Sequence, residues 1–303
     1  MEFIYAFGLL LSIAHAATDK ISKDLLDGWN PCAMYTFAEE GTASGTAECA
    51  IYTAPLCYPG ICDTPISRDK TMDIFVKRLP ATTGNADTAT NIWLVEGGPG
   101  AASSSIEFMM VDFHARLNGT VNVYSMDHRV AACAKAVERK YKNLAAFSMT
   151  SAATDLKTLI SEYSNGADTI VYGVSYGSTL VERLMHLDPP TVTGKLDPRT
   201  PHKYAEYLLD ALEGDNKELV TFQHVVHGTL SWSFLDEEDY ESETCGMKIF
   251  LSYVHSGADL AALNKSCLDE MPPLNWTTPI DYRNSFLSVV DPYDGIYDVN
   301  LSA

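Results

Sequence analysis

Hydrophobic and polar residues follow strand-like and helix-like periods in turn along the middle of this chain. Short runs rich in β-branched and apolar residues, bounded by Gly, Pro or Asn, predict strands. These runs lie at 72–78, 91–95, 121–126, 169–174, 191–196 and 218–226. The run at 169–174 is apolar almost throughout, which predicts a strand buried on both faces.

Helical spacing occurs between these strands. Residues 152–163 and 178–187 each place apolar side chains three or four positions apart, which predicts two amphipathic helices. A third helix is predicted over 201–213, because Pro201 suits the first helical position and Gly214 follows the last turn. Strands that alternate with helices predict an α/β fold, with a mostly parallel sheet covered by helices on both faces.

The two ends of the chain differ from this alternating region. Residues 3–13 form a largely apolar run of 11 residues, too short to span a bilayer, and Ala14-His15-Ala16 has the small residues of a cleavage site. We therefore expect a signal peptide over 1–16 and a secreted protein without membrane attachment. The rest of the chain is expected to form a Cys-rich N-terminal extension (17–70), an α/β domain (71–232) and a C-terminal helical extension (233–303).

Seven cysteines also favour an oxidising compartment. Cys32, Cys49, Cys57 and Cys62 allow three pairings, Cys245 and Cys267 could close a C-terminal loop, and Cys133 is left over. A zinc site is disfavoured, because no Cys-x-x-Cys pair or Cys/His alternation is present. Glycosylation sequons at Asn118, Asn264, Asn275 and Asn300 agree with secretion.

Composition narrows the classes of partner. Hydrophobic residues make up 46% of the chain and charged residues 20%, as in globular proteins. The formal net charge of −19 repels phosphate backbones and anionic lipids, so we expect neither nucleic-acid nor membrane binding.

The strongest candidate for chemistry is Gly173-Val174-Ser175-Tyr176-Gly177, a G-x-S-x-G between a predicted strand and a predicted helix. A serine on such a tight turn has an exposed hydroxyl, and the helix N-terminus after it favours a developing oxyanion. This context favours a nucleophilic serine, and the alternative is an ordinary strand-to-helix turn.

A second motif, Gly97-Gly98-Pro99-Gly100, directly follows the predicted strand 91–95. Such a loop can present backbone N–H groups to a reacting carbonyl. Taken alone it could be a tight turn or a phosphate-binding loop, although it lacks the spacing and lysine of a P-loop. Its place upstream of the serine motif is typical of an oxyanion loop.

Together these motifs resemble a known family. The segments Trp93–Gly100, Met126–Arg129 and Gly173–Gly177 are similar to the α/β-hydrolase peptidases of the prolyl aminopeptidase and tripeptidyl aminopeptidase family. Leu196–Pro201 resembles the stretch around that family's catalytic Asp, and His227-Gly228 resembles its catalytic His.

The resemblance implies an α/β-hydrolase fold and a serine hydrolase that needs no metal or organic cofactor. Ser175 would be the nucleophile, His227 the general base and then acid, and Asp197 the group that orients the imidazole. The backbone N–H groups of Gly98 and Tyr176 would form the oxyanion hole.

The residues themselves indicate the same triad less specifically. The order Ser, Asp, His is the one that this fold uses. Asp197 precedes a predicted helix, so it could equally be an acidic residue at a helix start. Of the eight histidines, His227 follows a strand on a loop, whereas His224 is expected within that strand. His128 and Arg129 are expected to make structural hydrogen bonds and ion pairs.

The chain also departs from the family pattern. Only 21 residues separate Ser175 from Asp197, so the fold is expected to be shortened and to lack most of the cap. Residues 130–133 replace the family's glycine-rich continuation, and Glu96 places a negative charge beside the oxyanion loop, where it could oppose the chemistry.

Two functions are therefore expected. The first is a secreted serine hydrolase, an aminopeptidase-like peptidase acting on a peptide or on a small ester or amide. The alternative is a catalytically inactive secreted binding protein derived from a hydrolase. The sequence leaves the oligomeric state open.

Overall fold

The computed structural model describes residues 5, 6, 8, 9, 25–37, 46–62, 70–129, 138, 140, 143–185, 191–194, 201–211, 217–236, 239, 241–273, 288, 296 and 300. The chain divides into two compact units, Met1–Met271 and Pro272–Ala303. The helices and strands described below all belong to the first unit.

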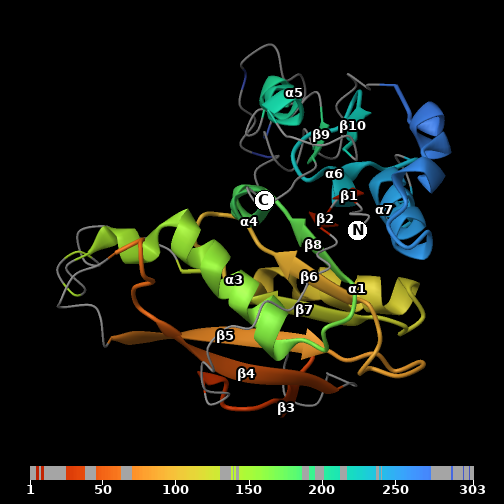
Figure 1. The fold of residues 1–303 in the computed structure, drawn as a ribbon. Helices are drawn as coiled ribbons and strands as arrows, with labels where there is room; N and C mark the ends of the chain where they lie inside the picture. Colours follow the sequence, from red (N-terminus) through yellow and green to blue (C-terminus); the bar gives the residue numbers. More distant parts are fainter. Residues whose placement is uncertain are drawn as a thin grey trace. The chain divides into compact units, whose positions relative to one another are not determined.

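A six-stranded mixed sheet forms the centre of this unit (Figure 1). Its strand order is β3 (Asn30–Ala33), β4 (Thr46–Pro55), β5 (Thr71–Leu79), β7 (Asn122–Met126), β6 (Asn91–Val95) and β8 (Thr169–Gly173). The ladders from β3 to β7 are antiparallel, whereas β6 pairs in parallel with both β7 and β8. Because parallel strands share a direction, the chain leaves β6, β7 and β8 at one edge of the sheet.

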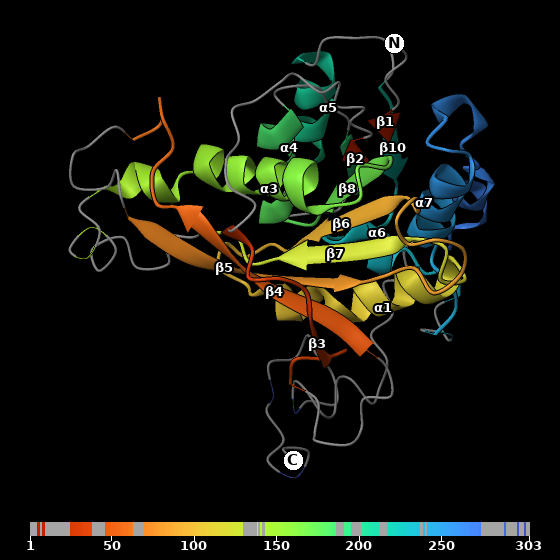
Figure 2. The same cartoon turned by 60° about the horizontal axis from the view of Figure 1, so that its bottom comes forward.

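Helices cover both faces of the sheet, as Figure 2 shows. One face packs on α3 (Met149–Tyr163) and α4 (Tyr176–Met185), and the other on α1 (Glu107–Arg116) and α7 (Cys245–His255). In β6, Trp93 and Val95 face the first pair of helices while Ile92 and Leu94 face the second. Neighbouring side chains of a strand point to opposite faces, and helices cover both faces, so both sets are buried.

Shorter elements complete the unit. β9 (Thr191–Gly194) and β10 (Leu219–Phe222) form a separate parallel pair, and β1 (Tyr5–Ala6) and β2 (Gly8–Leu9) an antiparallel pair. Among the described residues, the remaining helices are α5 (His202–Ala211) and α6 (Thr229–Trp232), with single 3-10 turns at Ser103–Ile106, Leu144–Phe147, Leu260–Ala262 and Ser266–Glu270.

The predicted α/β class is confirmed, with two differences in the sheet. It is mixed rather than mostly parallel, because β3 and β4 extend it by antiparallel pairing. β9 and β10 pair with each other instead of joining it. The chain between α4 and β9 is five residues long, from 186 to 190, which is too short for a helical cap.

Disulfides select one of the three open pairings. The bonds are Cys32–Cys49 and Cys57–Cys62, and the expected Cys245–Cys267 bond is also present. Cys133 lies outside the described residues. Within those residues, no helix has the length and apolar character needed to cross a membrane.

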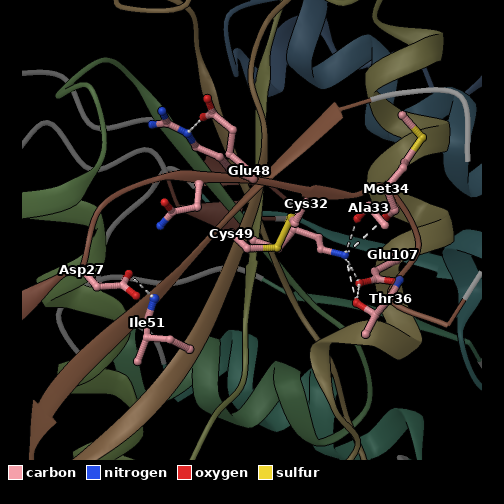
Figure 3. Close-up of a disulfide and its surroundings, with 12 residues drawn as sticks. Asp27, Cys32, Ala33, Met34, Thr36, Glu48, Cys49, Ile51 and Glu107 are labelled. Carbon is pink, nitrogen blue, oxygen red and sulfur yellow. Dashed lines mark hydrogen bonds and ion pairs between the residues drawn. A yellow bond between two sulfur atoms is a disulfide. The ribbon is translucent and has the colours of Figure 1, made fainter.

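A buried ion pair fixes the N-terminal strands onto the helical layer beside the first disulfide (Figure 3). The Lys77 ammonium on β5 contacts the Glu107 carboxylate on α1, and both side chains are almost fully buried. Lys77 also donates to the carbonyl of Ala33 at 3.1 Å and to the hydroxyl of Thr36 at 3.0 Å. The backbone N–H of Thr36 donates to Glu107 at 2.7 Å. One cation therefore ties β5, α1 and the segment after β3 together.

We predict that Lys77→Met lowers the free energy of unfolding by about 3–5 kcal/mol, because it leaves the Glu107 carboxylate buried without its cation. The double variant Lys77→Met with Glu107→Leu should recover most of this loss, since no buried charge remains. Urea unfolding of the three proteins measures both effects. A double variant no more stable than the single one would contradict this account.

Candidate active site

Ser175 lies on a strained turn between β8 and α4. Its φ is +56°, in the left-handed region that non-glycine residues rarely occupy. The turn is closed by hydrogen bonds from the N–H of Gly177 to the carbonyl of Val174 (2.8 Å) and from the N–H of Ser178 to the carbonyl of Ser175 (3.0 Å). This is the strand-turn-helix geometry that exposes a nucleophilic serine in α/β hydrolases.

Two glycines of the motif are required by close backbone packing. A Cβ at Gly173 would lie 2.4 Å from the carbonyl oxygen of Gly177, and a Cβ at Gly177 would lie 2.3 Å from that of Val95. Both separations are far below van der Waals contact. The G-x-S-x-G spacing is therefore a steric condition for bringing this turn against the end of β6.

The glycine-rich loop lies directly against the serine. A Cβ at Gly97 would be 2.7 Å from the Cβ of Ser175, so only glycine permits this approach. Gly98 has a φ of +113°, which also favours glycine. The sequence predicted a role for Gly98 and none for Gly97. The signal for this contact is the pair of consecutive glycines after a buried strand.

The sequence predicts the backbone N–H groups of Gly98 and Tyr176 as oxyanion donors, and the hydrogen bonds around them are as follows. Gly97 donates its N–H to Oε1 of Glu96 at 2.6 Å. By contrast, the N–H groups of Gly98 and Tyr176 donate to no acceptor within the described part of the chain. These two donors come from the loop and from the start of α4, which lie on either side of Ser175.

Glu96 acts electrostatically on its surroundings as well as binding Gly97. Burial, and then the negative charge of Glu96, raise the pKa of the Tyr172 phenol. The charge of Glu96 therefore disfavours ionisation of the buried Tyr172.

The segment Asp127–Arg129, which follows β7, is anchored on both sides. Oδ1 of Asp127 accepts hydrogen bonds from the N–H and the hydroxyl of Ser103, each at 2.8 Å. The fully buried Arg129 pairs with Asp155 on α3, with 2.6 Å between Nε and Oδ2. The structural role expected for Arg129 is confirmed.

The expectation for His128 was wrong. Its ring is buried and stacks on Tyr176, with the ring centroids 5.7 Å apart. Neither ring nitrogen has a hydrogen-bond partner in the parts of the chain that the structure describes. Burial lowers the pKa of His128 despite the opposing charge of Asp127, so the ring is held neutral beside the turn that carries Ser175. The polar contacts of this segment are made instead by its neighbours in sequence, Asp127 and Arg129.

Of the other two predicted triad residues, the structure describes only His227. His227 lies half-buried on the loop after β10 and is followed by Gly228, which has a φ of +80° and caps α6. Asp197 lies outside the described residues, so its role stays a prediction. His224 lies in the turn after Phe222 rather than in the strand, which ends four residues earlier than expected.

His202 pairs with Glu206 on the same helix, with 3.0 Å between Nε2 and Oε1. No group of three or more His, Cys, Asp or Glu side chains that could hold a metal ion is found among the described residues.

We predict that His128→Phe raises the free energy of unfolding by about 1 kcal/mol at pH 7.5, because the stack on Tyr176 is kept and two buried unpaired nitrogens are removed. The pKa of His128 is below its ordinary value of 6.5 in the folded protein. The unfolded chain therefore takes up a proton at higher pH, so the wild type loses stability as pH falls through 6.5.

Because Phe cannot titrate, the advantage of His128→Phe should be larger at pH 5 than at pH 7.5. Urea unfolding at the two pH values measures this difference. A variant less stable than the wild type, with a deficit independent of pH, would show that the nitrogens have favourable partners.

Solved structures show partial similarity to esterases. Esterase 2 of Thermogutta terrifontis phosphonylated by cyclosarin is 14% identical, over 67% of this chain and 96% of that chain, with a TM-score of 0.46. The same esterase phosphorylated by paraoxon is 14% identical, over 62% and 91%, also with a TM-score of 0.46. A cold-adapted esterase from an Arctic intertidal metagenomic library is 10% identical, over 64% and 88%, with a TM-score of 0.39. No protein-family model and no curated protein matches this chain in sequence.

Proposed function

We propose that this chain is a serine hydrolase of the α/β-hydrolase type. The observation that carries the proposal is the conformation of Ser175, at a φ of +56° between a glycine loop and the start of a helix. Strain of this kind persists only where the surrounding structure enforces it, and it clusters at reactive residues. The available N–H groups of Gly98 and Tyr176 provide the complementary electrostatic half of such a site.

In this mechanism the hydroxyl oxygen of Ser175 attacks a carbonyl carbon while His227 accepts the hydroxyl proton. The negative oxygen of the tetrahedral intermediate accepts hydrogen bonds from Gly98 and Tyr176. His227 then gives its proton to the leaving alcohol or amine, which departs as the acyl-enzyme forms. A water molecule then attacks the acyl carbonyl while His227 accepts a proton from it. His227 returns this proton to the oxygen of Ser175, and the acid is released with both residues restored.

Asp197 is proposed to orient the imidazole of His227 and to stabilise its charged form. β9 and β10 pair in parallel, so the chain leaves both at the same edge of their small sheet. In the sequence Asp197 comes three residues after the end of β9, and His227 five residues after the end of β10. This order supports a shared position for the two side chains.

Small esters and amides, including peptide bonds, are the proposed substrates. Only five residues join α4 to β9, so no cap domain is inserted there to select a peptide terminus. The aminopeptidase-like activity expected from the sequence is kept as a narrower proposal. Secretion, with a signal peptide over 1–16, is proposed too, and the three disulfides support it.

A binding protein derived from a hydrolase is the second candidate, and Glu96 is the observation that favours it. Its carboxylate is bound to the N–H next to that of Gly98. A negative charge so close to a developing oxyanion raises the energy of the transition state.

We predict that a fluorophosphonate probe labels the wild-type chain and that Ser175→Ala and His227→Ala each abolish labelling, because attack on phosphorus requires the serine and its base. Labelling is measured by gel fluorescence, with His255→Ala as the matched control that should label normally. His255 ends α7, outside the proposed triad. Absence of labelling in wild-type protein with a folded circular dichroism spectrum would favour the binding-protein alternative.

We also predict that Glu96→Gln increases kcat/KM for p-nitrophenyl acetate by about tenfold, which corresponds to removal of roughly 1–2 kcal/mol of repulsion at the oxyanion. The glutamine oxygen can still accept the hydrogen bond from Gly97, so the loop is retained.

Asp168→Asn is the control for a general change in charge, because Asp168 is exposed and precedes β8 at the opposite edge of the sheet. Its kcat/KM should equal that of the wild type. Equal or lower activity of Glu96→Gln would show that Glu96 does not oppose the chemistry.

A further inference from the structure

A cavity of about 460 Å³ opens at the edge of the sheet opposite Ser175. It is lined by Asn122, the first residue of β7, and by Asn165, which shortly precedes β8. Ser175 instead follows the other end of β8, so the full length of this strand separates the cavity from the proposed active site. Its volume lies within the range that small organic ligands occupy.

Three of the 13 residues that line the cavity are aromatic. Trp29, Tyr124 and Tyr163 all line it. Trp29 meets Tyr124 edge-on with the ring centroids 6.1 Å apart, and Tyr124 is backed by Trp93 in a stack at 4.7 Å. Tyr163 leans on Tyr52 at 5.7 Å. These contacts hold the three wall rings in place before any ligand arrives.

The charge around the cavity is negative. Asp87 and Glu162 line it with exposed carboxylates, and neither has a cationic partner within the described residues. The lining cation, Arg78, is paired with Glu48 and already lies 4.2 Å above the ring of Trp29.

The end of α3 adds to this negative potential. The helix ends at Tyr163, and its last turn contains no basic residue to offset the carbonyl dipoles. The side-chain amide groups of Asn122 and Asn165 donate to the carbonyl of Ala86, at 2.9 and 2.8 Å, so their donors are already used within the protein. The cavity thus combines aromatic rings with unpaired carboxylates and offers little to an anion.

We propose that this cavity binds an organic cation, specifically a small molecule with a quaternary or tertiary ammonium group. The rings of Trp29 and Tyr163 attract such a cation through their π faces, whereas Tyr124 is almost fully buried and supports Trp29. The exposed carboxylates of Asp87 and Glu162 add Coulomb attraction. The proposal concerns a second site and does not depend on the hydrolase activity of Ser175.

Isothermal titration calorimetry of the full chain with choline tests the proposal directly. The control ligand is 3,3-dimethylbutan-1-ol, which has nearly the same shape as choline without its charge. We expect saturable binding of one choline per chain, at least about tenfold tighter than binding of the alcohol, as expected for a desolvated cation–π site. Equal affinities for the two ligands, or no saturable choline binding at any concentration up to 50 mM, would overturn the proposal.

Two matched variants locate the site. Glu162→Gln should weaken choline binding about fivefold, as expected for the loss of one nearby charge partly exposed to water. Glu270→Gln removes a carboxylate that is also exposed but does not line the cavity, in the turn Ser266–Glu270, and should leave the Kd unchanged. Equal weakening by both variants would show that choline responds only to the overall charge, and an unchanged Kd in Glu162→Gln would also overturn the proposal.

Discussion

The close approach of β6 and β8 is the constraint on which the candidate site depends. The two strands pair in parallel with Val95 opposite Gly173, so the glycine loop and the serine turn begin side by side. Within this space a Cβ at Gly97, Gly173 or Gly177 would collide with neighbouring atoms. Glycine at these three positions lets Ser175 take a left-handed conformation with the loop directly against it.

A strained turn persists only when the surrounding structure is stable enough to impose it. β6 and β7 each lie between two other strands with both faces covered, so the end of β6 is held firmly in place. Buried charges reinforce the frame: Lys77 with Glu107 joins the sheet to α1, and Arg129 with Asp155 joins the end of β7 to α3. Each cation also binds a carbonyl of a neighbouring strand: Lys77 binds that of Ala33 in β3, and Arg129 binds that of Pro55 in β4.

Much of the fold could be predicted from the sequence, because strongly periodic segments reveal their structure locally. The strand over β8 and the helix over α3 are examples. β4 was not predicted because Ala47, Ala50 and Ala54 occupy three of its buried positions. Such small residues weaken the alternation of hydrophobic and polar residues that predicts a strand. At the site, Ser175 could be found from its motif, whereas the stacked and unpaired ring of His128 depends on a contact with Tyr176 that has no local signal.

Trapping of an acyl-enzyme would show whether this geometry makes Ser175 a nucleophile. The wild-type chain would be mixed with p-nitrophenyl acetate, quenched in acid within the first turnover and digested for mass spectrometry. We expect a burst of one p-nitrophenolate per chain and one acetyl group on Ser175, with neither in Ser175→Ala. Acetyl groups confined to lysines, in equal amounts in both proteins and without a burst, would contradict this expectation.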